Sequence, residues 1–215
     1  MTLFQKLVKT TEKNWKAYTE HEFVRLLGEG SLPKAMFQKY LMQDYVFLVE
    51  FSRAYGLAVF RAKTLEEMRE VEQTLHAIME VEMGLHVRLC AEWEISEAEL
   101  MKTQPLPQNK AYTDYVLSCG EKGDSLDLHI ALAPCVIGYA HIAKALLEQK
   151  NHNHNPYHQW IEEYASKEYQ EIAHAAERRL DYLGEGISEE RFESITRIFD
   201  KASALEADFW QMAME

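Results

Sequence analysis

Apolar side chains recur with a helical period along almost every stretch between turn signals, and strand-like alternation of apolar and polar residues is missing. This period is typical of helices that bury one face in a core. The pattern therefore predicts an all-α protein, a bundle of about eight to ten helices. The expected helices cover residues 4–15, 31–60, 110–118, 125–150, 156–183 with a break near residue 166, and 188–213, with two more starting at residues 64 and 96.

Three local signals of helix starts support this interpretation. Each places a hydroxyl where it can accept a hydrogen bond from the first backbone amides of a helix, which have no partner inside the helix. The signals are Ser31 before Pro33, Thr64 with Glu67, and Ser96 with Glu99, the last two at capping-box spacing.

One segment, ALAPCVIGYAHIAKALL at residues 131–147, reads as a long buried helix interrupted by Pro134 and Cys135. Proline removes a backbone donor and crowds the carbonyl four residues earlier, so a kink or a restart is expected near residues 130–134. Tyr139 follows Cys135 by one turn and projects from the same face. The two side chains could line a common cavity; the alternative is a small buried cysteine beside a packing tyrosine.

Length and charge restrict the domain organisation and the partners. The 215 residues contain no evident linker, low-complexity tract or internal repeat, so we expect a single domain over residues 1–215. The formal net charge of −12 disfavours nucleic acid and anionic membranes as partners. The N-terminal MTLFQKLVKTTEKNW carries frequent charges and resembles neither a secretion signal nor a membrane span, so a cytoplasmic protein is expected.

The thiols are few and widely spaced. Cys90, Cys119 and Cys135 form no CxxC pair. Such a set fits reduced thiols better than a disulfide framework or a zinc knuckle. One of them could therefore act as a nucleophile.

Histidines and carboxylates at helical spacing raise the question of a metal site. Glu72 with His76, and Glu82 with His86, are each four residues apart. At about 100° per residue the two pairs are roughly 80° out of phase, and no second helix offers a matching set. The run NHNHNPYHQW is expected to form a solvated turn. We therefore expect no metal and no cofactor.

Two carboxylates lie in apolar helical surroundings. Asp44 stands within YLMQDYVFLVEF, where burial is costly unless the carboxylate is hydrogen-bonded. Glu206 stands one turn before Trp210 in ASALEADFWQMA. The structural alternatives are that Asp44 pairs with an arginine such as Arg53 and that Glu206 faces solvent.

Four segments, QDYVFL, APCVIGYAHI, WIEEYAS and EADFWQMA, resemble in their order and separation those of the TenA family, also called thiaminase II, over essentially the whole chain. The resemblance implies the heme-oxygenase-like all-α fold, a homotetramer in many members, and metal-free hydrolysis of pyrimidine compounds related to thiamin. The expected partners are a small aminopyrimidine or thiamin and further copies of the chain.

The resemblance also implies site residues. The family's nucleophilic cysteine corresponds to Cys135, its essential glutamate to Glu206, and the aspartate that binds the aminopyrimidine to Asp44. The positions that correspond to the family's pocket lining are Phe47, Tyr112, Tyr139 and Tyr164. Many members carry tyrosine where this chain has Phe47, so one hydroxyl is missing here.

In the implied mechanism the thiolate of Cys135 adds to ring carbon C6 while Glu206 protonates N1, and Asp44 holds the 4-amino group and N3. The ring electrons then expel the substituent, water adds at the exocyclic methylene and the thiol leaves. The product is 4-amino-5-hydroxymethyl-2-methylpyrimidine. The substrate is either 4-amino-5-aminomethyl-2-methylpyrimidine or thiamin, and we favour the amine because the family is tied to salvage.

Two other functions remain open. A non-catalytic pyrimidine-binding or regulatory protein would keep the pocket without turnover, which the missing hydroxyl at Phe47 allows. A heme-oxygenase-like metal oxidase would use the set Glu72, His76, Glu82 and His86.

Overall fold

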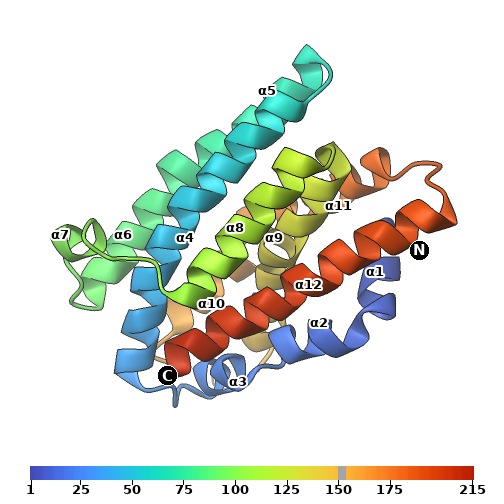
Figure 1. Ribbon diagram of the computed structural model, residues 1–215. Helices are drawn as coiled ribbons and strands as arrows, with labels where there is room; N and C mark the ends of the chain where they lie inside the picture. Colours follow the sequence, from blue (N-terminus) through green and yellow to red (C-terminus); the bar gives the residue numbers. More distant parts are fainter. Residues whose placement is uncertain (150–153) are drawn as a thin grey trace. The chain divides into compact units, whose positions relative to one another are not determined.

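The computed structural model describes residues 1–149 and 154–215, and in this part of the chain every regular element is a helix (Figure 1). The expected all-α class is therefore confirmed. The helices are α1 Leu3–Thr10, α2 Glu12–Thr19, α3 Glu22–Glu29, α4 Lys34–Arg61, α5 Leu65–His76, the π-helix η1 Ala77–Glu82, α6 Met83–Glu92, α7 Glu97–Leu100, α8 Pro107–Lys122, α9 Ser125–Leu147, α10 His158–Ala165, α11 Lys167–Leu183 and α12 Glu189–Met214.

The number of helices depends on how two short features are counted. The π-helix η1 joins α5 and α6 into one continuous run, and α7 is a single turn of 4 residues. With α5 to α6 taken as one helix and α7 left aside, the described residues hold ten helices. This is the upper end of the expected range.

Most of the predicted boundaries are confirmed. Thr64 accepts a hydrogen bond from the amide of Glu67, and Ser96 with Glu99 forms a complete capping box. The break near residue 166 is present, because the hydroxyl of Ser166 caps α11 by accepting from the amide of Tyr169 at 3.1 Å.

The first two predicted helices differ from the structure. The segment 4–15 is split into α1 and α2 at Thr11, whose φ of −111° and ψ of 28° lie outside the helical range. The Thr11 hydroxyl also donates to the carbonyl of Leu7 at 2.9 Å. Ser31 does not cap the long helix α4, which has Pro33 at its N-cap without a side-chain hydrogen bond. The fixed φ of Pro33 suits a helix start, so no hydroxyl is needed.

Helix α3 was not predicted, because its start signal is unusual. The ring nitrogen Nδ1 of His21 accepts from the amide of Phe23 at 3.1 Å, where serine, threonine or aspartate is commoner. The helix ends at Gly30, whose φ of 73° is in the left-handed region that favours glycine.

The apolar helix α9 runs through Pro134 without a restart, so the expected restart is wrong, while the kink stays a prediction. Proline removes only one backbone hydrogen bond, and all residues from 131 to 140 are buried, so packing stabilises the helix around it. The predicted end at residue 150 lies outside the described residues. By length and hydropathy α9 could also cross a membrane, but 78% of its apolar window is buried inside the structure, as in a core helix.

The chain divides into two compact units. Unit 1 comprises residues 1–32 and 129–211, and unit 2 comprises residues 33–128 and 212–215. In unit 2 the central helix α4 packs against α5, η1, α6, α7 and α8 (Figure 1). In unit 1 the rings of Phe4 on α1, Trp15 on α2 and Phe199 on α12 contact one another. The single domain stays a prediction, which one cooperative unfolding transition would support.

The π-helix η1 changes the face that the following helix presents to α4. Ile78 and His86 are both buried, yet in an uninterrupted α-helix eight residues would separate their directions by roughly 80°. A π-helical turn closes over one more residue than an α-helical turn, so each of its residues advances the phase by less. The segment therefore turns His86 toward α4.

Candidate active site

Asp44 lies in the middle of α4 and is 3% exposed. The hydroxyl of Tyr40, one turn earlier, donates to its Oδ2 at 3.2 Å, and Nδ1 of His86 on α6 lies 3.4 Å from the same oxygen. Burial raises the pKa of Asp44, while the neighbouring His86 and Tyr40 act to lower it. The alternative pairing with Arg53 is wrong, because Arg53 forms an ion pair with Glu50.

His86 is fixed on both sides of its ring. Its Nε2 lies 2.8 Å from the backbone carbonyl of Leu41 on α4, and its Nδ1 faces Asp44. One turn later, burial and the charge of Asp44 raise the pKa of the Cys90 thiol to about 12. Asp44, His86 and Cys90 therefore form one buried cluster.

The histidine and carboxylate set considered for a metal is used differently. His86 contacts Asp44, and no group of three or more potential ligands gathers at one point among the described residues. In the histidine run, His152 lies outside the described residues. The solvated turn is wrong for Asn155, which is buried and donates to the carbonyls of Leu27 and Gly28 at 2.8 and 2.9 Å.

Phe47 and Tyr112 pack against each other in unit 2. Phe47 follows Asp44 by three residues on α4, and its ring centroid lies 5.2 Å from that of Tyr112 on α8 and 5.2 Å from that of Phe51. Phe47 is 4% exposed, so a hydroxyl-free ring fills this buried position beside Tyr112.

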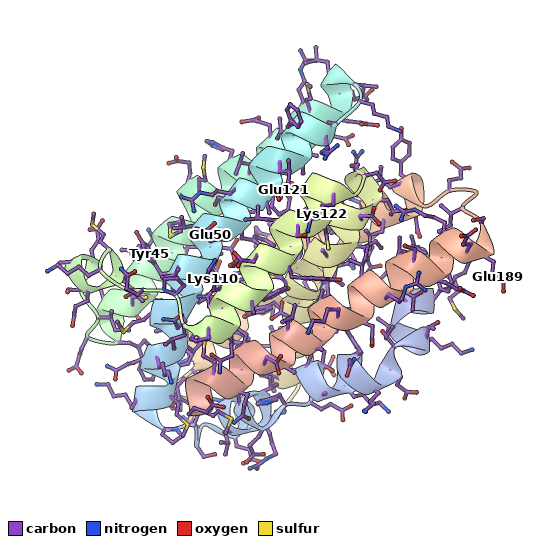
Figure 2. The ribbon with its side chains drawn as sticks, in the orientation of Figure 1. Tyr45, Glu50, Lys110, Glu121, Lys122 and Glu189 are labelled. Carbon is purple, nitrogen blue, oxygen red and sulfur yellow. The ribbon has the colours of Figure 1, made fainter. Side chains whose placement is uncertain are left out.

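Helix α8 is tied to α4 next to Asp44. The side-chain amide of Asn109 donates to the backbone carbonyl of Gln43 at 2.8 Å, and Oε1 of Gln43 accepts from the amide of Leu106 at 2.9 Å. Figure 2 shows that the same two helices also carry charged residues at the surface, among them Glu50 of α4 and Lys110 of α8. The hydrogen bonds at Gln43 fix the position of α8, and with it Tyr112, along the axis of α4.

The residues predicted on α9 lie together in unit 1. Cys135 is 9% exposed and Tyr139, one turn later, is 4% exposed. The ring of Tyr139 contacts three others, those of Trp160 at 5.7 Å, Tyr164 at 4.9 Å and Trp210 at 5.3 Å. Tyr139 and Tyr164 are therefore neighbours in an aromatic cluster on the face of α9 that also carries Cys135.

Glu206 lies on α12 one turn before Trp210 and is 1% exposed, so a solvent-facing role is wrong. Trp210 stacks on Phe23 at 4.8 Å and on Tyr18 at 6.2 Å, which fixes this turn of α12. Burial of a carboxylate costs free energy because the charged group loses its water. Carboxylates buried in this way are found more often at functional sites than elsewhere.

The seven predicted residues thus fall into two buried sets. Unit 2 contains Asp44, Phe47 and Tyr112, and unit 1 contains Cys135, Tyr139, Tyr164 and Glu206, all of them buried. Sequence reasoning missed the role of His86, Tyr40, Trp160 and Trp210. Only Tyr40 could have been found, since it stands four residues before Asp44 on the same helix face.

Comparison with known proteins adds independent information. The TENA/THI-4/PQQC family pattern matches residues 8–215. An uncharacterized protein of Haemophilus influenzae is 39% identical, covering 99% of this chain and 99% of its own length. An aminopyrimidine aminohydrolase of Halalkalibacterium halodurans is 34% identical, covering 99% of this chain and 96% of its own length.

Solved structures agree in fold. A crystal structure described as a TenA family transcription regulator from Silicibacter has a TM-score of 0.91 at 39% identity, covering 99% of this chain and 96% of its own. A heme-oxygenase-like domain from Shewanella denitrificans, at 12% identity, has a TM-score of 0.73 over 98% of this chain and 91% of its own. The second similarity concerns the fold alone, and the fold is heme-oxygenase-like.

Proposed function

Because this chain belongs to the TENA/THI-4/PQQC family, we propose that it is an aminopyrimidine aminohydrolase of thiamin salvage. Its substrate is 4-amino-5-aminomethyl-2-methylpyrimidine, which water converts to the 5-hydroxymethyl compound and ammonia. The observation that carries this proposal is the pair of buried sets, each combining a desolvated carboxylate, Asp44 or Glu206, with aromatic rings. A relative of that name, at 34% identity, supports it.

Asp44 recognises the pyrimidine in this proposal. A carboxylate can accept the hydrogen of the 4-amino group. The ring of Phe47 on the same helix and that of Tyr112 on α8, which contacts Phe47, offer flat surfaces to a flat heterocycle. Tyr139 and Tyr164 supply further ring faces.

Cys135 and Glu206 carry the chemistry. The thiolate of Cys135 forms a bond to ring carbon C6, which pushes an electron pair of the ring onto N1. Glu206 gives a proton to N1, so no negative charge remains on the ring. With the substrate amine protonated as ammonium, the C–N bond to the exocyclic methylene then breaks, its electron pair goes to nitrogen and ammonia leaves. Water adds to the methylene as hydroxide and releases its second proton to solvent. Cys135 departs as thiolate, and N1 returns its proton to Glu206.

The decisive test compares two cysteine substitutions. Cys135→Ser should retain affinity for the product pyrimidine but lose most turnover, because a serine hydroxyl is a far poorer nucleophile at neutral pH. Cys119→Ser is the matched control and should retain turnover, since Cys119 lies on α8 beside Tyr115. Full activity of Cys135→Ser at normal thermal stability would reject the covalent mechanism.

Substrate preference needs its own measurement. Thiamin would present the same pyrimidine with a thiazole as leaving group. We expect kcat/KM to be higher for the aminomethyl compound, and a higher value for thiamin would reverse the assignment.

A second function is a pyrimidine-binding or regulatory protein without turnover. The observation that favours it is Phe47, which presents no hydroxyl where many relatives do. Tight binding of the product pyrimidine, together with no hydrolysis of either substrate, would establish this second function instead.

The assembly belongs to the proposal as well. We expect a homotetramer, because large apolar side chains such as Phe60 and Leu65 are 76% and 62% exposed on the single chain. A cytoplasmic location and the absence of a metal or other cofactor remain predictions.

A further inference from the structure

The ring of His86 has a defined tautomer at one nitrogen. Its Nε2 lies 2.8 Å from the carbonyl oxygen of Leu41, and a carbonyl can only accept a hydrogen bond. Nε2 therefore carries a hydrogen. The other nitrogen, Nδ1, faces Oδ2 of Asp44 at 3.4 Å, so a second proton on the ring would lie between the imidazole and the carboxylate.

The two oxygens of Asp44 differ in their surroundings. Tyr40 and His86 both approach Oδ2. Within the described residues Oδ1 accepts no hydrogen bond from the protein, although Asp44 is only 3% exposed. One carboxylate oxygen is thus held by the protein while the other remains available to a ligand.

The groups around this pair come from two helices. On α4 there is Tyr40, and on α6 there are His86 itself and Cys90. Of these, His86 is the group that faces the carboxylate with a ring nitrogen and acts most strongly against the effect of burial on the pKa of Asp44, and it is 6% exposed. A buried carboxylate without such a partner is strongly disfavoured.

We propose that His86 is a positioning residue for Asp44, holding Oδ2 and supplying the compensating proton so that Oδ1 accepts the amino hydrogen of an aminopyrimidine. This inference rests on the proposed function, because it assumes that Asp44 is the group that contacts the substrate. It assigns a role in substrate binding to His86, which the sequence spacing had placed in a possible metal site.

The proposal has a defined pH dependence. The charge of His86 lowers the pKa of Asp44, against the burial that raises it. Removal of the imidazole takes away the larger of the two opposing influences and leaves only Tyr40 against burial, so Asp44 takes up a proton at a higher pH. The pH below which an aminopyrimidine dissociates should then move upward.

Two substitutions separate the orientation of Asp44 from its charge. In His86→Asn the side-chain amide can donate to Oδ2 from nearly the position of Nδ1, but carries no charge. In His86→Gln the amide reaches toward the Leu41 carbonyl and the contact with Asp44 is lost. His174→Gln, an exposed histidine on α11, is the control for the chemical change.

The probe is 4-amino-5-hydroxymethyl-2-methylpyrimidine, with Kd measured by calorimetry from pH 5 to pH 9. We expect that in both His86 variants the pH below which the probe dissociates is higher than in the wild type. Above that pH the Asn variant should bind the probe within about threefold of the wild type. The Gln variant should bind about tenfold more weakly, because it loses the charge-assisted hydrogen bond between residue 86 and Oδ2 of Asp44. The His174 variant should match the wild type.

Each other outcome overturns the inference. Unchanged Kd values and pH profiles in both His86 variants would remove His86 from substrate recognition. An equal loss of affinity at every pH would reveal only a packing role. If the wild type itself fails to bind the probe, the proposed function fails, and nitrogen-15 NMR of His86 then tests the pair alone: a ring without hydrogen on Nε2 would contradict it.

Discussion

The phenol of Tyr18 donates a hydrogen bond to the backbone carbonyl of Pro134, with 3.2 Å between the two oxygens. Tyr18 lies on α2 and is fully buried, and Pro134 immediately precedes Cys135 on α9. The same ring also packs against Gly138, one turn later. A single tyrosine therefore braces the turn of α9 that presents the proposed nucleophile.

Tyr18→Phe tests the hydrogen bond to Pro134. The substitution keeps the ring but leaves the carbonyl without this donor, so the free energy of unfolding should fall by about 1 kcal/mol. Urea denaturation measures the change. Tyr182→Phe serves as the control, since the Tyr182 side chain is 61% exposed and loses little. Equal stability of the wild type and the Tyr18 variant would show that the contact contributes nothing.

Gly138→Ala tests the packing of the same ring. A Cβ built at Gly138 would overlap the ring of Tyr18, so the variant should lose roughly 1–3 kcal/mol of stability through overpacking. Gly56 on α4 offers the matched control, because its Cβ would meet no atom within 4 Å. Gly56→Ala should gain about 0.5–1 kcal/mol from its higher helix propensity. Thermal unfolding that ranks the two variants the other way round would contradict the packing at Gly138.

The helices could be predicted wherever their signals are local. Ser96 and Ser166 cap their helices by accepting from backbone amides three residues later, and these boundaries are confirmed. The start of α3 at His21 could not be predicted, because the capping group is an imidazole. The course of α9 through Pro134 depends on burial from several sides, which a pattern along one helix does not contain.

The candidate site could be predicted only in part, for a related reason. Cys135 and Tyr139 share a face because they are four residues apart on one helix. The partner of Asp44 comes from a different helix, and η1 alters the phase of the run that carries His86. Neither the distance between helices nor a π-helical turn leaves a trace in the apolar period. Burial of Glu206 likewise follows from the packing of α12.

The three thiols should differ in reactivity. Burial raises the pKa of Cys90 to about 12 and also raises that of Cys119, so both have less thiolate at pH 8 than an ordinary cysteine. Iodoacetamide at pH 8 should therefore inactivate the protein through Cys135, and excess product pyrimidine should protect that thiol. Peptide mass mapping identifies the adduct. Rapid labelling of Cys90 in the folded protein would contradict the burial of this thiol.

The mass in solution should be that of four chains. One chain has a mass of 25.1 kDa, so light scattering at micromolar concentration should return about 100 kDa for the closed assembly that exposed apolar side chains favour. The control is the same measurement over a tenfold dilution, across which a tetramer of high affinity keeps its mass. A mass near 25 kDa would reject the assembly.

Asp44→Asn should weaken ligand binding and strengthen the fold at once. Loss of a charge-assisted hydrogen bond to the 4-amino group costs roughly 1.5–3 kcal/mol, so the product pyrimidine should bind about tenfold more weakly or worse in calorimetry.

Burial raises the pKa of Asp44 above its usual 3.8 in the folded protein. The folded state then holds a proton that the unfolded chain has already released, so the wild-type unfolding free energy falls as pH rises from about 4 through the folded pKa. The Asn variant lacks this titration, and its stability relative to the wild type should therefore increase with pH over that window. Asp114→Asn, on the exposed surface of α8, should change neither quantity appreciably. Unaltered affinity together with a loss of stability at every pH would identify Asp44 as a structural carboxylate and remove it from substrate recognition.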